Sequence, residues 1–184
     1  MSSLQADRSF FEAGVDQLEN YLLSPELYWP LSGKSDQPRL TIGALLLADR
    51  RLQGSENSPE GKLELVRLRM RLQALQAKWR SAWENKSIQE FRSRFQVWKD
   101  YLDEYRDTPD PNAADYPQRV RGRAILQLLG YDLPKPPVES LALKDLDHYL
   151  REALLPGTFC WEPQLVVAFP GDEYWFLYGK LKAK

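Results

Sequence analysis

Apolar residues recur every three or four positions along most of the chain, with charged residues between them, which is typical of amphipathic helices. The pattern predicts helices over residues 4–23, 41–53, 59–83, 87–106, 117–129 and 140–155. Ser58 and Pro59 form a helix start, because a Ser side chain accepts from free amides of the first turn and Pro has no amide to lose. We therefore expect a mainly α fold.

Two neighbouring stretches carry heptad seams that differ in chemistry and in phase. The first is Leu65, Leu68, Leu72, Leu75, Trp79 and Ala82, and the second is Ile88, Phe91, Phe95, Trp98, Leu102 and Tyr105. The seams are out of step by two positions, which a continuous helix does not tolerate, and Ser87 with Glu90 matches a capping box. This predicts a turn at residues 84–86 and a helical bundle built on a central antiparallel helical hairpin.

A second apolar side is present on the first of these helices. Leu63, Val66 and Met70 lie opposite the seam that begins at Leu65. We expect this helix to be covered twice, with the helices over residues 4–23 and 41–53 as the second layer.

The C-terminal part changes character, since residues 158–181 concentrate aromatic side chains. This composition predicts a small β-hairpin of residues 164–169 and 173–178 with Pro170 and Gly171 at the turn, or else an irregular aromatic tail. A short helix from Asp172 is the alternative. Residues 107–112 predict a loop, so we expect one domain over residues 1–184, with a possible subdivision into 1–107 and 112–184.

Charge and composition exclude several classes of function. There are 25 Lys and Arg against 26 Asp and Glu, so no global field attracts nucleic acid. With one Cys and one His, the chain lacks an internal disulfide and a His- or Cys-rich metal cluster, and we expect no cofactor. The sequence shows no signal peptide and no membrane-spanning run, which favours a cytoplasmic protein without a membrane partner.

Candidate catalytic groups are sparse, and we assign no catalytic residues. His148 has Asp145 three positions before it and Glu152 four after it, a row that could act as a base, although we interpret it as the polar side of a helix. Cys160, between two aromatic residues, is interpreted as a small buried filler. Gly33, Lys34 and Ser35 resemble the end of a phosphate-binding loop, but Tyr28 stands where the pattern needs Gly.

Basic side chains gather in two places and carry an alternative function. The candidates for a nucleic-acid surface are Arg67, Arg71, Lys78 and Arg80 on one helix and Arg119, Arg121 and Arg123 further on. The competing interpretation is that Arg69 and Arg71 pair with Asp100, Asp103 or Glu104 of the facing helix, while acids of the first helix neutralise the others.

Large aromatic residues supply the candidate interaction surface: Trp29, Tyr174, Trp175, Phe176 and Tyr178. Consecutive large side chains need cover on both sides, which a partner or a second copy could provide. The sequence therefore predicts a non-catalytic protein that acts through protein–protein interaction and self-associates. The alternatives are a nucleic-acid-binding module and a small-ligand binder or enzyme near His148 or the aromatic tail.

Overall fold

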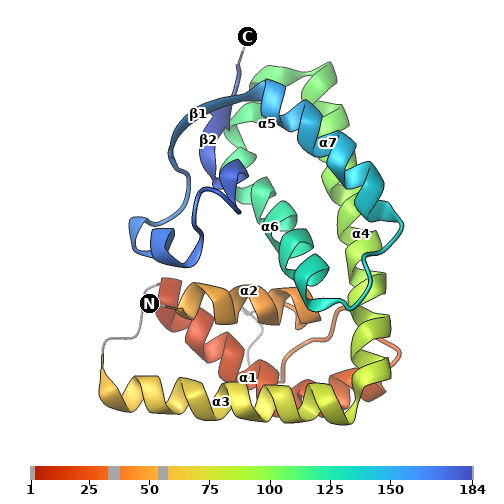
Figure 1. Ribbon diagram of the computed structural model, residues 1–184, viewed down its shortest axis with the longest axis vertical. Helices are drawn as coiled ribbons and strands as arrows, with labels where there is room; N and C mark the ends of the chain where they lie inside the picture. Colours follow the sequence, from red (N-terminus) through yellow and green to blue (C-terminus); the bar gives the residue numbers. More distant parts are fainter. Residues whose placement is uncertain (1–2, 33–37, 54–57, 184) are drawn as a thin grey trace. The chain divides into compact units, whose positions relative to one another are not determined.

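The computed structural model describes residues 3–32, 38–53 and 58–183, and it confirms a mainly helical protein with a small C-terminal sheet (Figure 1). The chain divides into two compact units, Met1–Glu90 and Phe91–Lys184. The number of domains stays a prediction.

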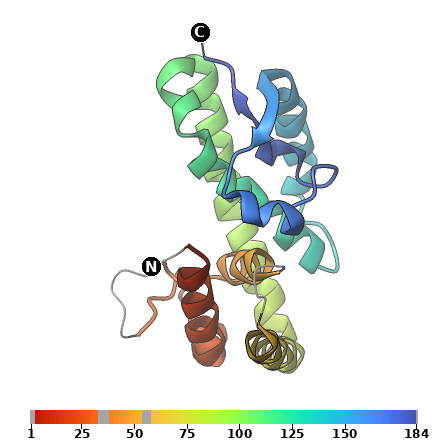
Figure 2. The ribbon, with the colours of Figure 1, turned by 90° about the vertical axis from the view of Figure 1, so that its left-hand side faces the viewer.

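The first unit contains α1 (Ser3–Leu23), α2 (Ile42–Leu52), α3 (Pro59–Lys78) and the first turns of α4 (Arg80–Asp107). α1 lies against both α2 and α3, as the two views show (Figure 1 and Figure 2). Gly14 permits the close approach of α1 to α2, because a Cβ there would lie 2.8 Å from Leu45 Cδ1. The core of the unit is formed by Phe10, Phe11, Val15, Leu18, Tyr21, Leu40, Ile42, Leu45 and Leu47.

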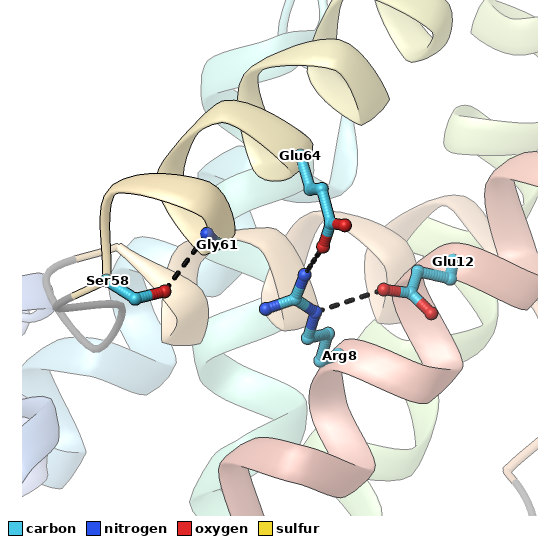
Figure 3. Close-up of polar contacts among 5 residues, drawn as sticks. All are labelled: Arg8, Glu12, Ser58, Gly61 and Glu64. Carbon is cyan, nitrogen blue, oxygen red and sulfur yellow. Dashed lines mark hydrogen bonds and ion pairs between the residues drawn. The ribbon is translucent and has the colours of Figure 1, made fainter.

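The start of α3 is fixed by a cap and by a cation from α1. Ser58 Oγ accepts a 3.0 Å hydrogen bond from the amide of Gly61, as the sequence predicts. Arg8 of α1 donates to Glu12 on its own helix and to Glu64 on α3 (Figure 3). The N-terminal half of α3 is therefore capped by Ser58 and joined to α1 by the Arg8–Glu64 ion pair.

The predicted helical hairpin with its turn at residues 84–86 is wrong. α3 ends at Lys78 and α4 runs without a break from Arg80 to Asp107. The interruption lies at Trp79, whose φ of −113° and ψ of 36° depart from helical values. Ser87 is fully buried inside α4, so it caps no helix.

Polar residues on the buried side of α4 explain this difference. Trp83, Lys86, Ser87 and Glu90 are all buried, so the helical period continues through the segment where the apolar pattern stops. Lys86 Nζ donates a 2.6 Å hydrogen bond to the carbonyl of Glu26. A buried polar group of this kind is tolerated because specific partners replace its water.

The first seam faces α1 instead of an aromatic helix. Leu65 and Leu72 are buried, and Leu68, Leu75 and Trp79 are half-buried. Trp79 Nε1 donates to Glu19 of α1 over 2.9 Å. α1 therefore packs against the seam side of α3. In the part of the chain that the structure describes, the expected second layer over Leu63, Val66 and Met70 is absent, because these side chains stay exposed.

The second unit contains the rest of α4, then α5 (Pro109–Ala114), α6 (Tyr116–Asp132) and α7 (Glu139–Ala153). α5 corrects the loop predicted over residues 107–112; Pro109 stands in its first turn, where a missing amide costs no hydrogen bond. The second seam contributes to the interior of this unit through Phe91, Trp98, Leu102 and Tyr105.

The small sheet pairs β1 (Leu154–Phe159) with β2 (Tyr178–Leu181) in antiparallel fashion, with a bulge between Pro156 and Phe159. The strands predicted at residues 164–169 and 173–178 are wrong in position. Those segments form the 3₁₀ helices η1 (Pro163–Ala168) and η2 (Trp175–Leu177) between the two strands. None of the helices in the described ranges has the length and apolar character needed to cross a membrane.

Candidate protein-interaction surface

The aromatic tail forms the interior of the second unit. Tyr174 and Phe176 are fully buried, and Phe169 meets Tyr174 edge to face at 5.0 Å between ring centroids. Tyr116 donates a 2.6 Å hydrogen bond from its hydroxyl to the carbonyl of Phe176. These side chains therefore stabilise their own unit and offer no exposed contact surface.

The other three aromatic candidates, Trp29, Trp175 and Tyr178, are half-buried and contact polar groups of their own units. The guanidinium of Arg151 lies 3.7 Å from the ring centroid of Trp175, and Tyr178 donates to the carbonyl of Phe169 over 2.7 Å. In the first unit, Trp29 Nε1 donates to Gln17 over 3.3 Å. Each of these rings has partners within its own unit, so none gives a strong reason to expect a partner protein.

Three of the four basic candidates of α3 and α4 form ion pairs with nearby acids, and Arg67 is the exception among the described residues. Arg71 lies 2.8 Å from Asp16, Lys78 2.7 Å from Glu19, and Arg80 2.8 Å from Glu84. The hydrogen bond from Lys78 lowers the pKa of the Glu19 carboxyl below its usual value. The expected partners of Arg69 and Arg71 on a facing helix, Asp100, Asp103 and Glu104, are wrong, because the acids come from α1 and α2; Arg69 pairs with Asp49.

The second basic group does not form one exposed patch. Arg123 is buried and holds Asp147 through two hydrogen bonds of 2.6 and 2.7 Å, while its guanidinium lies 4.5 Å from the ring centroid of Phe176. Arg119 and Arg121 are exposed, and Arg119 lies over the ring of Tyr101. One of the three candidates is therefore a structural residue of the second unit.

The row around His148 lies on the outer side of α7. His148 Nε2 is 3.6 Å from Glu152 Oε1, and both side chains are largely exposed. The groove of about 320 Å³ that α7 forms with α6 is lined by Phe91, Leu126, Leu143 and the Arg123–Asp147 pair, and His148 takes no part in it. Because the imidazole is exposed and does not line this groove, the polar side of a helix accounts for the row.

Metal and thiol chemistry find little support. Within the described ranges, no group of three or more His, Cys, Asp or Glu side chains could hold a metal ion. Burial raises the pKa of the Cys160 thiol to about 11, which makes it a poor nucleophile at neutral pH. Gly33, Lys34 and Ser35 lie outside the described residues.

The outer face of α3 carries an apolar stripe that is about half-exposed or more among the described residues. Leu63 is 52% exposed, Val66 48% and Met70 64%. They stand at spacings of three and four, so they follow one line along the helix. Ala74 and Ala77, also exposed, continue this line toward the C-terminal end of α3. We call these five residues the α3 stripe.

Two cations border the α3 stripe. At 100° per residue, Lys62 falls on one side of the line from Leu63 to Met70 and Arg67 on the other. Both are exposed, and among residues 3–32, 38–53 and 58–183 neither has a carboxylate within ion-pair distance. The helical pattern of the sequence identified the apolar residues, but only the structure shows that they remain uncovered.

Comparison of the chain with protein-family models, with curated proteins and with solved structures gives no match. The functional conclusion therefore depends on the geometry of the chain itself.

Proposed function

We propose that the protein acts without catalysis, by protein–protein interaction, and that the α3 stripe is the contact surface. The observation that carries this proposal is the exposure of Leu63, Val66 and Met70 at helical spacing on a well-anchored helix. Apolar residues at this spacing are typical of the surface through which one helix packs against another.

The energetics favour a partner on this face. Full burial of a large apolar side chain contributes about 1.5–3 kcal/mol, and each of the three is only about half buried. The helix that presents them is already fixed by the Ser58 cap and by the ion pairs to α1 and α2. A partner would therefore meet a preformed surface and spend little free energy on ordering it.

The sequence-based expectation of self-association is tested alongside, as the case in which the partner is a second copy of the chain. A cytoplasmic location belongs to the same proposal. Nucleic-acid binding is the weaker alternative, because Arg71, Lys78 and Arg80 have carboxylate neighbours and Arg123 is buried.

The experiment compares the full chain with Met70→Lys and with Val97→Lys as a matched control, because Val97 on α4 is a similarly exposed apolar residue outside the stripe. Sedimentation velocity over a wide concentration range measures self-association, and affinity capture followed by binding of the purified partner measures other proteins. We expect Met70→Lys to lose a partner that Val97→Lys retains. A monomer at all concentrations, with no partner lost in Met70→Lys, would overturn the proposal.

A further inference from the structure

We infer that the partner of the α3 stripe is an amphipathic helix with acidic residues beside its apolar line, and not a second copy of this chain. This inference rests on the function proposed above, since it names the partner of the same surface. It is carried by the charges that border the stripe.

The positions of these charges follow from heptad geometry. With Leu63 and Met70 at a positions and Val66 at d, Lys62 falls at g and Arg67 at e. Positions e and g are the ones that face a partner helix from either side of the apolar contact and decide which partner is accepted. The stripe therefore presents one positive charge on each flank.

A second copy would bring like charges together in both possible orientations. In a parallel pair, a g residue faces the e residue five positions on, so Lys62 would face Arg67 of the second copy. In an antiparallel pair centred on the three large apolar residues, Leu63 to Met70, the axis passes near Val66, so Arg67 would face Arg67 of the second copy. Repulsion thus opposes self-pairing through α3.

Neighbouring carboxylates do not reverse this charge. Glu64 is occupied by Arg8 (Figure 3). Glu60 lies on the same side as Arg67, but it precedes the stripe. It stands in the first turn of α3, where the positive end of the helix dipole stabilises its negative charge. Lys62 and Arg67 remain without an acidic partner among the described residues, so a helix with Glu or Asp at its e and g positions would supply the missing charges.

The test uses two peptides of equal length with Leu at every a and d position, one with Glu and the other with Lys at every e and g position. Neither pairs well with itself, because its own flanks repel. Their binding to the full chain is measured by fluorescence anisotropy. We expect the acidic peptide to bind at least about tenfold more tightly than the basic one. The acidic peptide forms ion pairs with Lys62 and Arg67, whereas the basic peptide is repelled by both.

Variants separate the charges from the apolar contact. The double variant Lys62→Glu with Arg67→Glu should reverse the preference, whereas Lys135→Glu with Lys144→Glu, exposed cations of the second unit, should leave it unchanged. Circular dichroism checks that all variants keep their helices. Met70→Lys should abolish binding of both peptides.

The outcomes distinguish the inference from the function on which it rests. Equal binding of both peptides, lost in Met70→Lys, would overturn the acidic partner but support the binding face. Concentration-dependent dimers that Met70→Lys dissociates would overturn the acidic partner in favour of a second copy. Failure of both peptides to bind, together with a strict monomer, would overturn the inference and the proposed function together.

Discussion

Glu90 fixes the start of α2 from a position 49 residues further along the chain: its Oε1 accepts a 2.6 Å hydrogen bond from the hydroxyl of Thr41. Its Oε2 accepts a 2.7 Å hydrogen bond from the amide of Gly43, while Thr41 Oγ1 accepts from the amide of Ala44. One buried carboxylate therefore satisfies groups at the N-terminal end of α2, where the helix dipole also favours a negative charge.

We predict that Glu90→Ala destabilises the protein by about 2–4 kcal/mol, because it removes hydrogen bonds to a charged group and leaves buried donors unsatisfied. Glu90→Gln keeps an acceptor and should cost less, about 1–2 kcal/mol. Urea denaturation followed by circular dichroism measures both, with Glu104→Ala, an exposed residue of α4, as the control. Equal stability of Glu90→Ala and the wild type would show that Glu90 does not hold α2 in place.

Glu90 also shows why the path of α4 could not be predicted from the apolar pattern. The spacing of apolar residues identified the helical segments, including the Ser58 start of α3. The break in the pattern came from Lys86, Ser87 and Glu90, which occupy buried positions although their side chains are polar. Burial of such residues depends on partners distant in sequence, and a local pattern contains no information about them.

The candidate site was predictable in part for a related reason. Periodicity identified Leu63, Val66 and Met70 as a second apolar side of their helix, but it could not tell a covered side from an open one. The aromatic tail shows the reverse, because residues such as Tyr174 and Phe176 look like a surface in need of a partner and instead fill their own unit. Which apolar side chains find cover within the chain is a property of tertiary packing.

Lys86 should make the stability of the protein depend on pH in a direction unusual for a cation. Burial lowers the pKa of its ammonium below 10.5, while its Nζ lies 4.4 Å from the ring centroid of Tyr21. Between the lowered pKa and about 10.5 the unfolded chain binds more protons, so stability contributed by Lys86 rises as pH increases through this window. Below the lowered pKa the contribution is constant.

The measurement is urea denaturation at several pH values for the wild type and for Lys86→Met, whose difference isolates this residue. Lys99 provides the opposite case, because hydrogen bonding to Asp103 raises the pKa of its ammonium. Stability contributed by Lys99 is complete below its unfolded pKa and is lost as pH rises through the raised pKa. A wild-type advantage over Lys86→Met that falls with rising pH would contradict the assignment.

Phe176 tests whether the aromatic tail is interior. Its side chain is fully buried and faces the guanidinium of Arg123. We expect Phe176→Ala to cost about 3–5 kcal/mol, as for other large aromatic side chains removed from a core. Val167, a strongly exposed residue of η1, gives the control Val167→Ala with little expected change. A small effect of Phe176→Ala in thermal or urea denaturation would mean that the tail lies outside the folded core.

Cys160 should react slowly with alkylating reagents. Desolvation raises the pKa of its thiol to about 11 from the ordinary 9.0, and its backbone amide is fixed by a 2.8 Å hydrogen bond to the carbonyl of Leu177. Two pKa units reduce the thiolate present at neutral pH by about a hundredfold. Iodoacetamide labelling followed by mass spectrometry should show this slowing relative to the chain unfolded in urea. Equal rates in the two states would refute it.

We expect the protein to bind nucleic acid weakly and with only a slight dependence on salt concentration. Each phosphate that a protein neutralises contributes a slope of about −0.9 to the dependence of log binding constant on log salt concentration. Arg71, Lys78 and Arg80 already have carboxylate neighbours, so a few exposed cations such as Arg67 and Arg119 remain to contact phosphates. We expect a slope no steeper than about −2 for an oligonucleotide, and little change in Arg67→Gln. A steep slope that Arg67→Gln reduces would favour the nucleic-acid alternative over a protein partner at α3.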